Sequence, residues 1–135
     1  MGNLELARWY AALLGVALVI FGFAGFLDNP VVGRPSAQPV FVSGTTLNLL
    51  HVGAGAVALF VAFGLTPEGL VWGLAGFGLG FAALLLASIV SPTLAGLSDV
   101  QLSRADQALY AGLATLSVVV AWLARREALA ERGSA

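Results

Sequence analysis

The residues of this chain that could do chemistry are few, and they lie inside long apolar stretches. His51 is the only histidine, and Asn48 precedes it by three positions. Asp106 and Tyr110 are four positions apart in a later stretch. Residues three or four apart share one face of a helix, so each pair predicts a polar face. Such side chains could carry protons, bind a metal ion or ligate haem, or they could hydrogen-bond two helices together.

A structural role is favoured for both ionisable side chains. One histidine cannot ligate haem from both sides within a chain, cysteine is absent, and partners for a zinc site at His51 are lacking. Asp106 stands three positions after Ser103, where its carboxylate can cap the first turn of a helix. We therefore expect no enzyme activity, no cofactor and no metal. We predict instead a polar layer of Asn48, His51, Asp106 and Tyr110 that joins two helices.

The surroundings of these residues predict a membrane protein. Four apolar stretches contain no Asp, Glu, Lys or Arg: Trp9–Leu27, Thr45–Leu65, Leu70–Val90 and Gln107–Ala124. Each approaches the roughly 20 residues that a helix needs to cross the hydrocarbon core of a bilayer. The 59% share of hydrophobic residues and the mean hydropathy of +0.95 agree. A net charge of −1 argues against binding of nucleic acid through a basic face.

The predicted fold is an all-α integral membrane four-helix bundle, antiparallel and up-down, with both termini on the same side. One transmembrane domain covers residues 1–135, with helices over approximately 6–27, 45–65, 67–90 and 104–125. Thr66 and Pro67 predict a capped start of the third helix, which would form a tight hairpin with the second. Ser103 and Asp106 predict a capping box at the start of the fourth. The first stretch is too long for a signal peptide, so we expect it to be retained.

The arginines predict the orientation. Arg8, Arg125, Arg126 and Arg132 belong to the side of the termini, whereas Arg34 and Arg104 belong to the other side. Because positive charge accumulates on the cytoplasmic side, we expect cytoplasmic termini and a multi-pass protein of the cell membrane, such as a bacterial inner membrane. Trp9 and Tyr10 are expected to anchor the first helix at the headgroups.

Small residues predict where helices touch. The chain has 17 glycines, and many recur at the four-residue spacing that lets helix backbones approach closely in membranes. Packing within the bundle is favoured over a dedicated dimer face. The glycines expected in helix packing are Gly15, Gly22, Gly55, Gly76, Gly80 and Gly112.

Several of these positions resemble a known family. The matching residues are Arg8 and Gly22 to Phe26 in the first stretch, Asn48, His51 and Gly55 in the second, and Asp106 in the fourth. In this pattern the chain resembles the bacterial four-helix integral membrane family catalogued as domain of unknown function 4383. Leu47, Gln107 and Tyr110 depart from it, standing where the family pattern has His, Asn and His. The resemblance implies the four-helix fold and the polar layer but no activity.

The sequence leaves three functional hypotheses. The leading one is a structural or accessory membrane component, as a homo-oligomer or as a subunit of a larger assembly, with the lipid bilayer as its surroundings. The second is a small transporter or proton-conducting unit that uses His51, Asp106 and Tyr110. The third is a site for a lipid or a quinone-like ligand, lined by Phe and Gly residues of the first and third helices, with His51 orienting a polar head.

Overall fold

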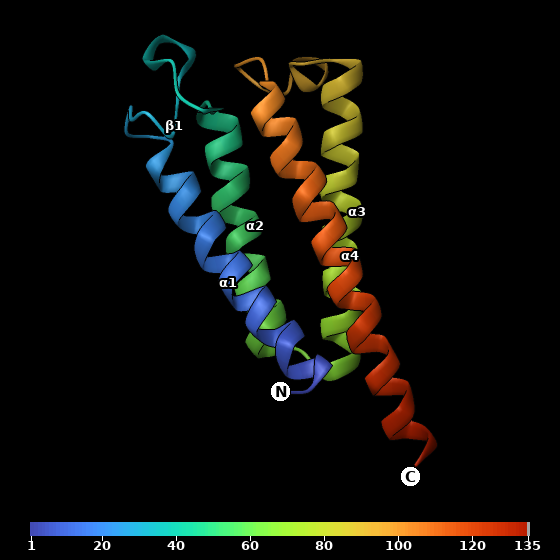
Figure 1. Ribbon diagram of the computed structural model, residues 1–135. Helices are drawn as coiled ribbons and strands as arrows, with labels where there is room; N and C mark the ends of the chain where they lie inside the picture. Colours follow the sequence, from blue (N-terminus) through green and yellow to red (C-terminus); the bar gives the residue numbers. More distant parts are fainter. Residues whose placement is uncertain (135) are drawn as a thin grey trace.

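The computed structural model describes residues 1–134 and contains four long helices. Their bounds, with those of the short elements between them, are α1 (Asn3–Ala24), β1 (Val32–Gly33), η1 (Pro35–Ala37), β2 (Phe41–Val42), α2 (Thr45–Gly64), α3 (Pro67–Val90), η2 (Leu94–Gly96) and α4 (Arg104–Gly133). All four helices are long and apolar enough to cross a membrane. The helices run alternately up and down, and both termini lie at the same end (Figure 1). The chain is an all-α, multi-pass membrane bundle, as predicted.

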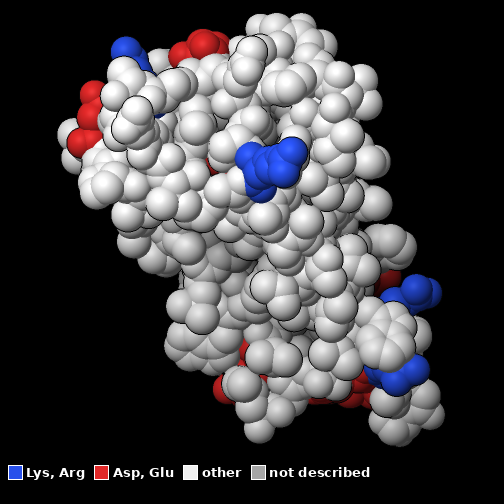
Figure 2. All heavy atoms as spheres, turned by 45° about the horizontal axis from the view of Figure 1, so that its top comes forward, with Lys and Arg blue, Asp and Glu red and all other residues white. Residues whose placement is uncertain are grey.

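Charge is distributed as a bilayer requires. Asp, Glu and Arg side chains gather at the two ends of the molecule, and a wide belt without charge separates them (Figure 2). Large apolar side chains cover this belt and point outward, among them Leu13, Ile20, Phe63, Leu79 and Leu86. Exposure of such a surface to water would be unfavourable, but exposure to hydrocarbon carries no free-energy penalty. Unpaired backbone N–H and C=O groups do carry a penalty in hydrocarbon. The helical backbone satisfies those groups internally.

The helices pack as two close pairs. α1 lies against α2 and α3 lies against α4 along most of their lengths, whereas α2 and α3 touch little although only Leu65 and Thr66 connect them. Near this connection Gly73 of α3 meets Val61 of α2, but farther along α3 a Cβ added at Gly76 or Gly80 would meet nothing within 4 Å. The tight turn of the predicted hairpin is confirmed, but the two helices diverge from it and do not pack along their lengths.

Glycine makes the contact between α1 and α2 close. A Cβ added at Gly15 would lie 2.8 Å from the carbonyl oxygen of Gly55, and one added at Gly55 would lie 2.7 Å from that of Gly15. One added at Gly22 would lie 2.7 Å from the carbonyl oxygen of Asn48. These three glycines pack between helices as predicted.

Three other glycines do not. A Cβ added at Gly76, Gly80 or Gly112 would meet nothing within 4 Å, and all three residues are exposed. The prediction that they pack inside the bundle is wrong. Each lies on a face of α3 or α4 that is turned away from the other helices, so their spacing has no use within one chain.

Two helices differ from their predicted bounds. α1 has the predicted length of 22 residues but begins and ends three positions earlier, and α4 is longer than predicted. α1 begins at Asn3 because a carboxylate of α4, that of Glu127, accepts the backbone N–H groups of Asn3 and Leu4. α4 continues to Gly133 rather than ending near residue 125. Its last turns are rich in Ala, Leu, Glu and Arg, which favour helix, and Arg132 pairs with Glu68 of α3 at 2.6 Å.

A matched pair of substitutions on α2 tests the glycine contact. Gly55→Ala should lower the stability of the protein by about 1–3 kcal/mol, because the new methyl group overlaps the backbone of α1. Gly53→Ala, two positions away, adds the same methyl group in open space and should be neutral or stabilising. Thermal unfolding in detergent measures both, and equal effects of the two substitutions would contradict the assignment.

Candidate functional site

The best-defined polar contact inside the helices joins α2 to α4. His51 Nε2 and the Tyr110 hydroxyl are 3.0 Å apart, and these residues are only 2% and 1% exposed. Phe21 packs edge-on against the imidazole with the ring centroids 5.1 Å apart, and Phe81 stacks on Tyr110 at 6.1 Å. The helical spacing and depth of these two residues predicted such a link, and the structure brings them together.

The other imidazole nitrogen has no partner. His51 Nδ1 is buried and finds no hydrogen bond among residues 1–134. Either neutral tautomer therefore leaves one polar atom of the ring unpaired, at some cost in free energy. No group of three or more His, Cys, Asp or Glu side chains that could hold a metal ion occurs within residues 1–134. The geometry of the pair is that of a link between helices.

Asn48 does not join this pair. Its Oδ1 accepts a hydrogen bond from the hydroxyl of Ser43, and its amide fills the space left by the missing side chain of Gly25 at the end of α1. Asn48 is 2% exposed and Ser43 is fully buried. The residue therefore ties the start of α2 to the end of α1 and to the segment before α2.

Asp106 also turns to the backbone and side chains of its own end of the bundle. Its Oδ2 accepts hydrogen bonds from the N–H and the hydroxyl of Ser103, both at 2.7 Å, and from the N–H of Val42 at 3.2 Å. The Ser103 hydroxyl accepts the Asp106 N–H in return, which completes the predicted capping box. The carboxylate thus caps α4 and holds β2 against it.

The predicted polar layer is therefore divided into separate links. His51 and Tyr110 bond each other, while Asn48 and Asp106 bond partners at the ends of their helices. The reason is position: Asn48 and Asp106 lie in the first turns of α2 and α4, where loop and helix-end groups need partners. His51 and Tyr110 lie one turn deeper, out of reach of those groups.

A second carboxylate at this end was missed by the sequence analysis. Asp99, in the connection from α3 to α4, accepts the N–H of Thr45 at 3.2 Å and so caps the start of α2. Gly44 makes this approach possible, because a Cβ there would overlap the carboxylate. The sequence contains only a weak signal for this cap. Gly44 precedes a helix that has no acidic residue in its own first turn, so a carboxylate from another segment can take that place.

Charged side chains also close the end that carries the termini. Arg8 of α1 donates to the carbonyl oxygens of Ala62 at 2.6 Å and Leu65 at 3.0 Å, where α2 ends. Glu127 of α4 accepts backbone N–H groups at the start of α1. A cation at a helix C-terminus and an anion at an N-terminus also match the helix dipole. The sequence did not predict this contact of Arg8.

Tyr10 is placed differently from the prediction. Trp9 is 58% exposed, as a headgroup anchor would be, but the hydroxyl of Tyr10 lies 2.9 Å from the hydroxyl of Ser117 on α4. Ser117 is fully buried. Tyr10 therefore turns inward and joins α1 to α4. If its ring pointed to the headgroups instead, the buried Ser117 hydroxyl would lose this hydrogen bond.

A double-mutant cycle tests the central link. Tyr110→Phe and His51→Leu should each lower stability, and the two should couple by about 0.6 kcal/mol, the average for hydrogen bonds between helices in membranes. Unfolding in detergent, followed for both single variants and the double variant, measures the coupling. A gain in stability on replacing His51 would show that the imidazole is retained for something other than stability.

Comparison of the chain with protein-family models, with curated proteins and with solved structures gives no match. The resemblance to the four-helix family stays a prediction.

Proposed function

We propose that this protein is a structural or accessory component of a membrane assembly, as a homo-oligomer or as a subunit of a larger complex. The observation that carries this proposal is a stripe of small residues on α3, formed by Gly76, Gly80, Ala83 and Ala87. All four are exposed, and their spacing places them along one side of the helix. The bundle does not use this stripe.

Larger apolar side chains lie beside the stripe. Trp72, Leu79 and Leu86 of α3 are 65%, 70% and 63% exposed. Helices associate in membranes by close van der Waals packing rather than by the hydrophobic effect, since lipid tails are as apolar as leucine. A second helix can approach the backbone most closely where the side chains are small. We therefore expect a helix of another chain to lie along α3.

A larger side chain within the stripe tests this proposal. Gly80→Leu should weaken association strongly but leave the monomer folded, because the position is open within the chain. Gly53→Leu on α2 is the matched control, since Gly53 is also exposed and open. Cross-linking in native membranes, followed by mass spectrometry of the gently extracted protein, measures the partner. A wild-type chain that is monomeric and without partner in both measurements would contradict the proposal.

The distribution of arginine supports a cytoplasmic position of both termini. The arginines of the terminal end are Arg8, Arg125, Arg126 and Arg132, against Arg34 and Arg104 at the other end.

Thiol labelling tests this topology. Because the chain has no cysteine, Ser36→Cys and Ser134→Cys each introduce a single exposed thiol. A membrane-impermeant maleimide should label Ser36→Cys on intact cells but Ser134→Cys only after lysis. The reverse pattern would invert the proposed topology.

A further inference from the structure

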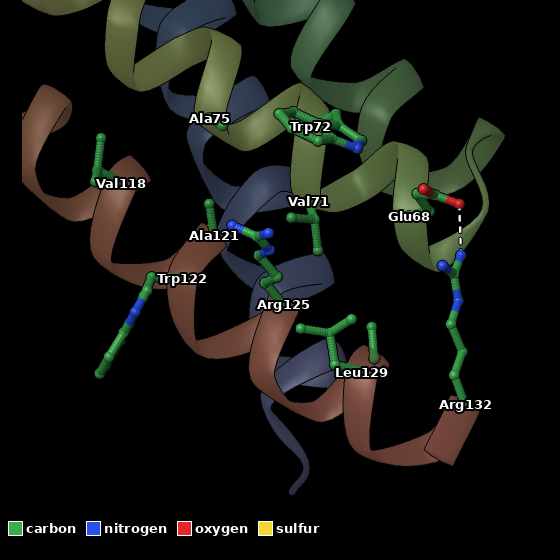
Figure 3. A pocket seen from close by; sticks show the side chains of 11 residues that line it. Glu68, Val71, Trp72, Ala75, Val118, Ala121, Trp122, Arg125, Leu129 and Arg132 are labelled. Atoms are coloured by element: carbon green, nitrogen blue, oxygen red, sulfur yellow. Dashed lines mark hydrogen bonds and ion pairs between the residues drawn. The ribbon is translucent and has the colours of Figure 1, made fainter.

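A groove opens between α3 and α4 near the end that carries the termini. Its volume is about 340 Å³. Apolar side chains line most of it, including Val71 and Ala75 of α3 and Val118 and Ala121 of α4, and the paired Glu68 and Arg132 lie toward its outer end (Figure 3). The groove therefore runs from the polar end of the molecule into the belt that faces hydrocarbon.

Arg125 brings a positive charge into this groove. Its side chain rises from α4 and lies between Val71 and Ala121 (Figure 3). No hydrogen bond or ion pair engages its guanidinium within residues 1–134. The neighbouring arginines are occupied, since Arg132 pairs with Glu68 at 2.6 Å and the guanidinium of Arg126 lies 3.8 Å from the ring centre of Trp122. Arg125 is thus the cation of the groove whose donors remain available.

The groove lies at the depth of lipid headgroups. Arg125 is on α4 one turn beyond Ala121, close to where the apolar stretch of that helix ends. Trp72 and Trp122 also line the groove and are 65% and 50% exposed, as aromatic residues at the boundary of a bilayer commonly are. A ligand here would place a polar group beside Arg125 and an apolar chain along the remainder of the groove.

We infer that this groove binds an acidic phospholipid. The guanidinium of Arg125 would hold the phosphate, because its planar donors match phosphate oxygens in pairs. One acyl chain would lie along Val71, Ala75, Val118 and Ala121. Two arginines and one glutamate line the groove, so its charge favours an anionic headgroup over a zwitterionic one. This site adjoins the stripe on α3 at Trp72 but contains none of the stripe residues, and it does not depend on the proposed function.

Lipid retention tests the site directly. The protein is reconstituted in nanodiscs that contain equal amounts of phosphatidylglycerol and phosphatidylcholine, released gently, and analysed by native mass spectrometry. The wild type should retain phosphatidylglycerol selectively. Arg125→Gln should lower its retention roughly tenfold, as expected for the loss of a charge-assisted contact. Arg125→Lys should fall between the two, since an ammonium group lacks the paired donors.

Two controls remove the same charge elsewhere. Arg104→Gln and Arg34→Gln both act at the opposite end of the bundle. Both should retain phosphatidylglycerol within about twofold of the wild type, which is smaller than the change expected from one charge-assisted hydrogen bond. Equal retention of the two lipids by the wild type would overturn the proposal. So would an equal loss in Arg125→Gln and Arg104→Gln, or displacement of the lipid by millimolar inorganic phosphate alone, which would indicate a simple anion site.

Discussion

An α-helix ends with backbone groups that have no partner inside the helix, and here charged side chains from other parts of the chain supply those partners. Glu127 of α4 accepts N–H groups at the start of α1, and Arg8 of α1 donates to carbonyl groups where α2 ends. Asp99 caps the start of α2 from the connection before α4. In a membrane this requirement is severe, because unsatisfied groups at the edge of the hydrocarbon are costly. The helix ends therefore decide which segments must meet.

Polar contacts, at the helix ends and between them, also link the two helix pairs. Apolar packing is close within the α1–α2 pair and the α3–α4 pair but sparse between α2 and α3, and lipid competes with any apolar contact between pairs. The polar links cross this boundary: Glu127 to α1, Asp99 to α2, Asp106 to β2, His51 to Tyr110, and Tyr10 to Ser117. They occur at both ends and at two levels between. Buried apolar side chains of all four helices also pack together between the pairs, so polar links and apolar packing together define how the pairs dock.

The sequence predicted what depends on neighbours along the chain. Apolar stretches located the four helices, Thr66 and Pro67 located the start of α3, and the four-residue spacing paired Asp106 with Tyr110 on one face. It could not predict contacts such as that of Asn3 with Glu127, which are 124 positions apart, because their existence depends on how the pairs dock. Asn48 was assigned to the correct end but to the wrong partner. The predicted capping of α4 by Asp106 and Ser103 is confirmed, but Asp106 does not also join His51 and Tyr110. Nearby helix-end groups competed for Asn48 and Asp106 more effectively than His51 and Tyr110 did.

The spacing of glycines also predicts helix contacts only in part. Gly15 and Gly55 face each other across the α1–α2 contact, and neither tolerates a Cβ without moving a backbone. Gly76 and Gly80 have a spacing that is equally suitable for helix contact, yet they lie open. The spacing of small residues indicates only that another helix can approach closely. The positions of the other helices determine whether such an approach occurs. Because no other helix of the chain covers Gly76 and Gly80, a contact made at these positions requires no rearrangement within the bundle.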